Sequence, residues 1–256
     1  MYFVFARTPP GNAEECLAQH VLYRSVHKYR QLRWMSTKLC KDSSVPLSQE
    51  QAYVIGRPRE FDIDRALERA MELFWRQGYE GTSVADLTRE LGLTRPSLYA
   101  AFESKEALFL RALDLYEARA GYRQAALTAP TAGAYARALL EGAADLHGDN
   151  RNPPGCLGVQ SALACAPQAD AIRKELIRRR KIGEGIIRDR LKRAKTEGDL
   201  PPDADPANLA RYLSIVIYGI TIQAAGGATR KELRNAAELA LRCWPQAPNA
   251  KSIQDG

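Results

Sequence analysis

The chain has 256 residues, 45% of them hydrophobic and 26% charged, with a net charge of +7, and this length suffices for one large or two small globular domains. Its five unevenly spaced cysteines do not form a disulfide framework, so a reducing, cytoplasmic location is expected. No run reaches the roughly 18–20 apolar residues that span a bilayer, and the apolar start is too short for a secretory signal, which excludes a membrane protein.

Residues 1–55 differ from the rest of the chain, because aromatic, basic and polar residues are mixed there without a sustained period. We expect an extension that is either disordered or the product of a misassigned translation start, with Met35 or Val54 as alternative starts. Its cysteines and histidines fit no regular metal-ligand spacing. Neither a metal site nor a cofactor is therefore predicted.

Residues 56–104 are predicted to form a three-helix DNA-binding domain. Apolar residues recur at helical spacing over residues 62–77, and Gly78 is expected to end this first helix. Its aromatic residues are interpreted as packing residues. Arg57 lies just ahead of the helix, where it is a candidate phosphate contact on an extended arm.

The segment 82–105 has the pattern of two short helices joined by a tight turn. Ser83 can cap the first helix, with Asp86 in the capping-box position, and Gly92 can end that helix in a left-handed conformation. Thr94 can cap the second helix, which has a proline in its first turn. This spacing predicts a helix-turn-helix.

The exposed N-terminal end of the second helix is the part that a helix-turn-helix inserts into the major groove. Arg95 can form a forked pair with a guanine edge, and Lys105, at the start of the next helix, favours a phosphate. Residues 56–122 carry a net charge of −2, so few phosphate contacts per subunit are expected. The candidate DNA contacts are Arg57, Thr82, Ser83, Thr94, Arg95, Pro96, Ser97, Tyr99 and Lys105.

Over residues 56–118 the sequence resembles the TetR/AcrR family of transcriptional repressors. The resemblance rests on LFWRQGY at the end of the first helix and on GTSVADLTRELGLTRPSLYAAFESKEALF after it. It implies a DNA-binding domain followed by a helical ligand-binding domain. One departure is that the family often has a histidine just before the phenylalanine, where this chain has Ala100 and Ala101. Base discrimination is therefore expected to depend on Thr94, Arg95, Pro96, Ser97 and Tyr99.

Residues 105–245 are predicted to form a helical regulatory and dimerisation domain, and residues 246–256 a disordered tail. No segment shows strand-like alternation, so the predicted fold class is all-α. The basic run 178–181 is a second candidate for nucleic-acid contact, although such a run is usually a solvated face. Helices are expected at about 105–120, 131–146, 155–167 (rich in small residues), 168–197 (weakened near Gly183 and Gly185), 206–222 and 230–244.

The run LARYLSIVIYGITI, which follows Asp205 and Pro206, is apolar on nearly all sides and must be covered. The expected cover is a second copy of the chain, with a homodimer interface at about 206–244. The resemblance agrees, because members of the family typically form dimers through their last two long helices. A dimer would present two reading helices to a palindromic site on double-stranded DNA.

The resemblance further implies that a small-molecule inducer enters the C-terminal domain, although the sequence does not identify it. An alternative is that Cys156 senses oxidants or electrophiles, because it follows Pro-Pro-Gly near a helix N-terminus, where a thiolate is favoured. Cys165 is a second cysteine of the same segment. The competing interpretation is that both are small buried apolar residues.

Three classes of function are compatible with the sequence. A ligand-responsive DNA-binding repressor is favoured, and the alternatives are an enzyme and a helical interaction protein without DNA binding. The sequence has no paired-carboxylate, metal-ligand, phosphate-loop or nucleophile motif that would indicate an enzyme. No enzymatic activity is therefore expected.

Overall fold

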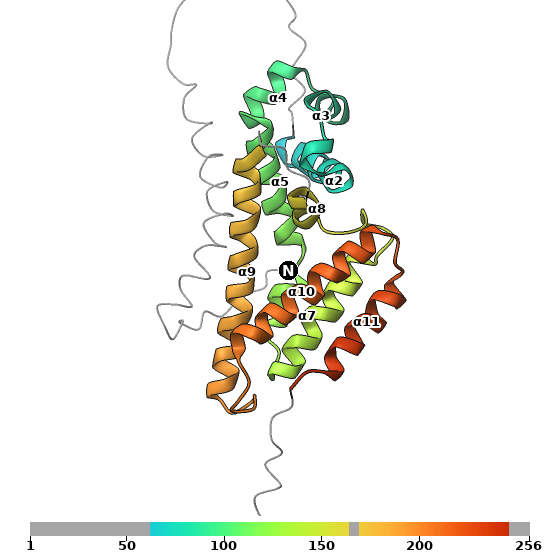
Figure 1. The fold of residues 1–256 in the computed structure, drawn as a ribbon. Helices are drawn as coiled ribbons and strands as arrows, with labels where there is room; N and C mark the ends of the chain where they lie inside the picture. The colour runs from blue at the N-terminus through green and yellow to red at the C-terminus, as the bar shows by residue number, and fades with distance from the viewer. Residues whose placement is uncertain (1–61, 164–168, 246–256) are drawn as a thin grey trace, which may run out of the picture. The chain divides into compact units, whose positions relative to one another are not determined.

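The computed structural model describes residues 62–163 and 169–245, which contain helices and no strand (Figure 1). This confirms the all-α prediction. Within these residues no helix is long and apolar enough to cross a membrane. The helices are α2 (Ile63–Gly81), α3 (Val84–Leu91), α4 (Arg95–Phe102), α5 (Lys105–Arg119), α6 (Tyr122–Ala126), α7 (Ala132–His147), α8 (Leu157–Leu163), α9 (Asp170–Thr196), α10 (Pro206–Ala225) and α11 (Arg230–Arg242).

Several predictions concern residues that lie outside these two segments. They are the extension at residues 1–55, the tail at residues 246–256, the arm residue Arg57 and the cysteine Cys165.

The ends of α3 are set by local hydrogen bonds that the sequence predicts. Ser83 Oγ accepts from the Asp86 N–H at 3.1 Å, and the Asp86 carboxylate accepts from the Ser83 N–H at 3.0 Å. Gly92 ends the helix with φ of 68°, a left-handed conformation that costs glycine little. The predicted capping box and the predicted glycine stop are both confirmed.

One apolar core holds α2, α3, α4 and α5 together, and we call the first three of these helices the head. Phe74 of α2 meets Phe109 of α5 edge to face, with ring centroids 5.1 Å apart. Leu98 and Phe102 of α4 are buried against them, as their spacing predicts. The same core continues into α8 and the N-terminal half of α9, so the head packs directly on helices that follow much later in the chain.

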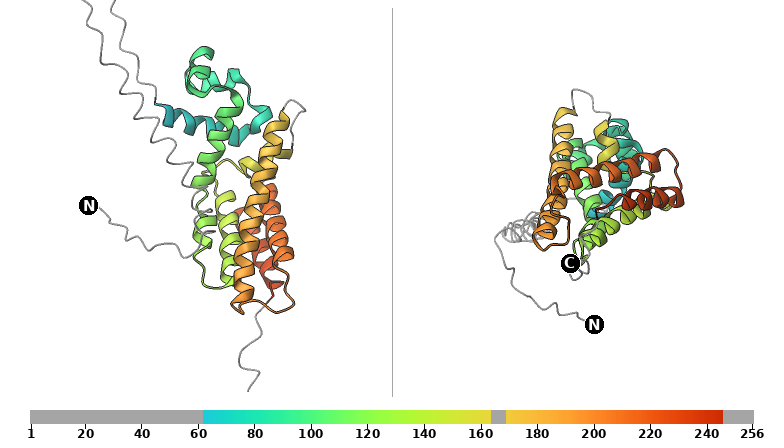
Figure 2. Two further views of the ribbon diagram at one scale, coloured as in Figure 1. Left: turned by 90° about the vertical axis from the view of Figure 1, so that its left-hand side faces the viewer. Right: turned by 60° about the horizontal axis from the view of Figure 1, so that its bottom comes forward.

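A second core lies among α7, α10, α11 and the C-terminal half of α9 (Figures 1 and 2). α9 runs unbroken through Gly183 and Gly185, where the sequence predicts a weakening. The basic run in this helix is not wholly solvated, because Arg179 pairs with Asp114 and Glu117 of α5, each at 2.7 Å. These ion pairs attach α9 to the helix that follows the head.

The loop between α7 and α8 is joined to α2 by hydrogen bonds on the carbonyl oxygen of Gly155. This oxygen accepts from Trp75 Nε1 of α2 at 2.8 Å and from Nδ1 of His147, the last residue of α7, at 2.9 Å. Because a carbonyl can only accept, the Nδ1 atom carries the hydrogen of a neutral imidazole. We call this arrangement the Gly155 junction.

His147 is expected to make the protein sensitive to acid. Burial lowers its pKa from 6.5 to about 4. The unfolded chain then binds a proton more readily than the folded chain between these values, so the free energy of unfolding should fall by about 3 kcal/mol as the pH drops through this window. Above pH 6.5 this residue should contribute no pH dependence.

The matched variant is His147→Asn, whose amide N–H can replace the Nδ1–H donor but does not titrate. Urea unfolding of both proteins from pH 7.5 to pH 4 measures the difference. Parallel pH profiles for the two proteins would show that His147 is not the responsible group.

Candidate nucleic-acid interface

The first turn of α4 presents a cluster of polar and basic side chains to solvent. Thr94, Arg95, Pro96 and Ser97 are all exposed there. Thr94 Oγ1 accepts from the Ser97 N–H at 3.3 Å and lies 2.8 Å from Ser97 Oγ, so the cap also orders the two hydroxyl groups. The structure therefore places together four residues that the sequence predicts as DNA contacts.

Arg95 lies against the half-buried Tyr99, with its guanidinium carbon 5.8 Å from the centre of the ring. Tyr99 also packs on the core of the head, which gives the pair a rigid base. In the described part of the chain no carboxylate pairs with Arg95. Its five N–H donors are thus available for an acceptor in a groove.

Lys105, the first residue of α5, lies over the ring of Tyr79 with its Nζ atom 4.2 Å from the ring centre. Burial lowers its pKa, while the nearby carboxylates of Glu80 and Glu106 raise it. The Ser104 hydroxyl caps the same helix end by accepting from the Ala107 N–H at 3.0 Å. A cation held over an aromatic ring at a helix N-terminus is suited to bind phosphate.

The structure corrects the prediction for Thr82. This residue is 0% exposed, and its hydroxyl donates to the Gly78 carbonyl at 2.8 Å. The side chain therefore closes the end of α2 and has no surface to offer DNA. Ser83 is exposed, but its hydroxyl also donates to Asp86 at 2.6 Å within the capping box. Its role at the DNA remains a prediction.

Cys156 lies half-buried just before α8. Its thiol is one of the groups that raise the pKa of Tyr116 well above the usual value, the largest cause being burial of the hydroxyl. From the sequence, Tyr116 can equally line an apolar pocket or belong to the core, whereas the short helix α6 has no local motif and is not predicted.

Comparison with known proteins relates the chain to bacterial regulators. Residues 66–112 match the family described as "Bacterial regulatory proteins, tetR family". The HTH-type transcriptional repressor ComR of Escherichia coli K12 is 34% identical over 194 residues, which cover 75% of this chain and 92% of ComR. The HTH-type transcriptional repressor BdcR of the same organism is 29% identical over 198 residues, covering 76% and 94% of the two chains.

A solved structure agrees with these relatives. It is a cysteine mutant of CifR, a TetR family transcriptional regulator, complexed with 26-bp double-strand operator DNA. Its sequence is 41% identical to this chain, and the match covers 74% of this chain and 100% of CifR with a TM-score of 0.71. The likeness therefore extends well beyond the helix-turn-helix, into the helices that follow it.

Proposed function

The chain belongs to the TetR family of bacterial regulatory proteins, and from this premise we propose a dimeric repressor that reads a palindromic operator. A small molecule bound among the C-terminal helices releases it from the DNA. The observation that carries the proposal is the exposed first turn of α4, where Arg95 has no acidic partner among the described residues. This is the end of a reading helix that enters the major groove.

An apolar face on the last two helices supports the dimer. Ile215 and Ile222, one face of α10, are 61% and 48% exposed, and Gly219 between them is also exposed. Leu239 of α11 is 63% exposed. An unpaired apolar surface of this kind is typical of a subunit interface, and a small residue at its centre allows close approach of a second helix.

Release by a ligand requires differential affinity. The ligand must bind more tightly to the conformation in which the two heads of the dimer do not fit the operator than to the DNA-binding conformation. The ratio of these two affinities sets the largest possible decrease in DNA binding. The core shared by the head, α8 and α9 supplies a physical connection for such a shift.

Operator binding by the wild type and two variants tests the reading head. Arg95→Ala should lower the affinity for the operator by about 5- to 150-fold and relax the preference at one base pair, because a forked contact to a base is lost. Lys105→Ala should weaken binding to all sequences. It should also make the slope of log affinity against log salt concentration shallower by about one per subunit, because one phosphate contact is lost.

The measurement is fluorescence anisotropy with DNA from upstream of the gene, at several salt concentrations. Lys192→Ala is the control, since it removes an exposed cation from α9. If Arg95→Ala and Lys105→Ala both bind as tightly as the control, then α4 and the start of α5 do not form the DNA interface.

A second candidate for the input is electrophile sensing through Cys156. It is favoured by the position of the thiol beside the hydroxyl of Tyr116 and directly after Gly155, whose carbonyl is tied to the head. A covalent adduct there would disturb the junction. Cys156→Ser should then abolish release of the operator by N-ethylmaleimide, while Cys243→Ser, at an exposed cysteine, should leave it unchanged. Equal release from both variants would remove Cys156 from consideration.

A further inference from the structure

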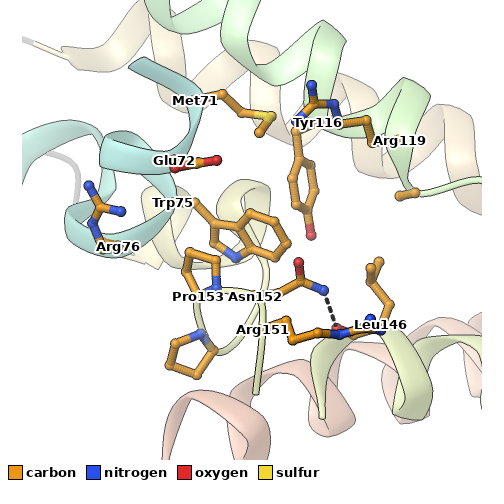
Figure 3. A pocket seen from close by; sticks show the side chains of 12 residues that line it. Met71, Glu72, Trp75, Arg76, Tyr116, Arg119, Leu146, Arg151, Asn152 and Pro153 are labelled. Carbon is orange, nitrogen blue, oxygen red and sulfur yellow. Dashed lines mark hydrogen bonds between the residues drawn. The ribbon is translucent and has the colours of Figure 1, made fainter. Parts of the chain in front are cut away.

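A pocket of about 470 Å³ opens between α2, α5 and the loop that follows α7 (Figure 3). Met71 and Trp75 of the head form one wall, and Tyr116 of α5 forms another. Leu146 and Pro153, at the end of α7 and in the next loop, complete its apolar lining. The pocket is therefore built from the head and from later helices together.

The hydroxyl of Tyr116 is the most informative group in this pocket. The side chain is only 5% exposed, and its oxygen meets no partner at full hydrogen-bonding geometry, the weakly polar thiol of Cys156 being beside it. Figure 3 shows the ring directed into the pocket, with the hydroxyl toward Trp75 and Asn152. A buried hydroxyl without a partner is costly. It can be satisfied by an acceptor that enters the pocket.

The aromatic lining favours a flat ligand. The rings of Trp75 and Tyr116 meet edge to face, with centroids 4.7 Å apart and an angle of 79° between planes. Trp75 Nε1 already donates to the Gly155 carbonyl, so the indole offers only its apolar surface. Because the two rings already touch, a ligand ring would lie against them and not between them, where it gains apolar burial and ring contacts.

The charges around the pocket favour an anion. Arg76, Arg119 and Arg151 line it, against the single carboxylate of Glu72. Arg119 pairs with Glu68 and Arg151 with Asp149, whereas Arg76 has no ion pair within the described residues. Arg76 is therefore the arginine of the lining whose N–H donors are not committed to an ion pair in the described part of the chain, and a carboxylate could accept from them.

We propose that this pocket binds a small aromatic carboxylate, with the ring against Trp75 and an oxygen accepting from the Tyr116 hydroxyl. The proposal deepens the proposed function, on which its regulatory consequence rests, by naming the chemical class of the inducer and by placing it where the C-terminal helices meet α2 of the head. Because the walls come from both α2 and the loop after α7, a bound ligand fixes their separation. It can thereby favour a head position that does not fit the operator.

Binding is tested first without DNA, by calorimetric titration of the full chain with 2-naphthoate. We expect a dissociation constant on the order of 1 mM or tighter, as for a fragment-sized ligand. Tyr116→Phe should weaken binding by about tenfold, because a charge-assisted hydrogen bond is lost. The same variant should melt no lower than the wild type, since the hydroxyl has no partner in the free protein.

The matched control is Tyr212→Phe, which removes a hydroxyl that donates to the Ala240 carbonyl on α11 at 2.8 Å. It should leave the naphthoate affinity unchanged, and the neutral amide of the probe should bind more weakly than the carboxylate. The absence of binding at several millimolar, or equal affinity in the Tyr116→Phe variant, overturns the pocket assignment.

A second measurement adds 2-naphthoate to the complex with operator DNA. Release of the DNA by the wild type, at probe concentrations where Tyr116→Phe keeps its DNA, supports the regulatory role. Binding of the probe without release overturns that role. Failure of the probe-free protein to bind any operator would instead overturn the proposed function, whatever the calorimetry shows.

Discussion

Replacing Ile215 with glutamate is expected to leave a folded monomer and to lower the apparent affinity for a palindromic operator by about 10²- to 10⁴-fold. The side chain is 61% exposed, so the substitution removes little packing within one subunit. In a dimer it would place a carboxylate at the centre of an apolar interface, where charge is poorly tolerated. A monomer then binds each half-site independently. It loses the increase in affinity that arises when one bound head holds the second head close to the other half-site.

Light scattering coupled to size exclusion gives the mass, and anisotropy gives the affinity for the whole operator and for a single half-site. Gln124→Glu is the control, because it adds the same carboxylate at an exposed position of α6. The half-site affinity should not change in Ile215→Glu. A variant that remains dimeric would move the interface away from this face of α10.

Gly155→Ala should destabilise the protein by about 2–4 kcal/mol. Gly155 has φ of +81°, which strains any other residue, and an added Cβ would lie 2.9 Å from the Cβ of Ala225 and 2.3 Å from the amide nitrogen of Gln160. The glutamine end can move, but the contact with Ala225 requires a shift of α10 or of the loop. The carbonyl that accepts from Trp75 and His147 would move with it.

Gly183→Ala is the matched control for this substitution. Gly183 lies within α9, and its added Cβ would come no closer than 3.7 Å to the guanidinium of Arg123. Alanine there should stabilise the helix by roughly 0.5–1 kcal/mol. Urea unfolding of both variants measures the two opposite shifts. A Gly155→Ala protein as stable as the wild type would show that the junction tolerates movement.

The reading helix could be predicted almost completely from local sequence. Its caps, its glycine stop and its inward residues depend on neighbours within four positions, so short-range rules suffice. The prediction for Thr82 was wrong because cap residues and DNA contacts share the same polar residue types. Only the observed burial of the side chain, with its hydroxyl bonded to Gly78, separates the two roles.

The sequence by itself determined the long helices of this protein and the ends of the reading helix, with its exposed basic first turn. The tertiary structure alone decided what joins them. The Gly155 junction, the pairing of Arg179 with α5 and the pocket beside Tyr116 all bring together residues more than 30 positions apart. Helical periodicity specifies which face of a helix is buried, but it carries no information about which distant helix covers that face.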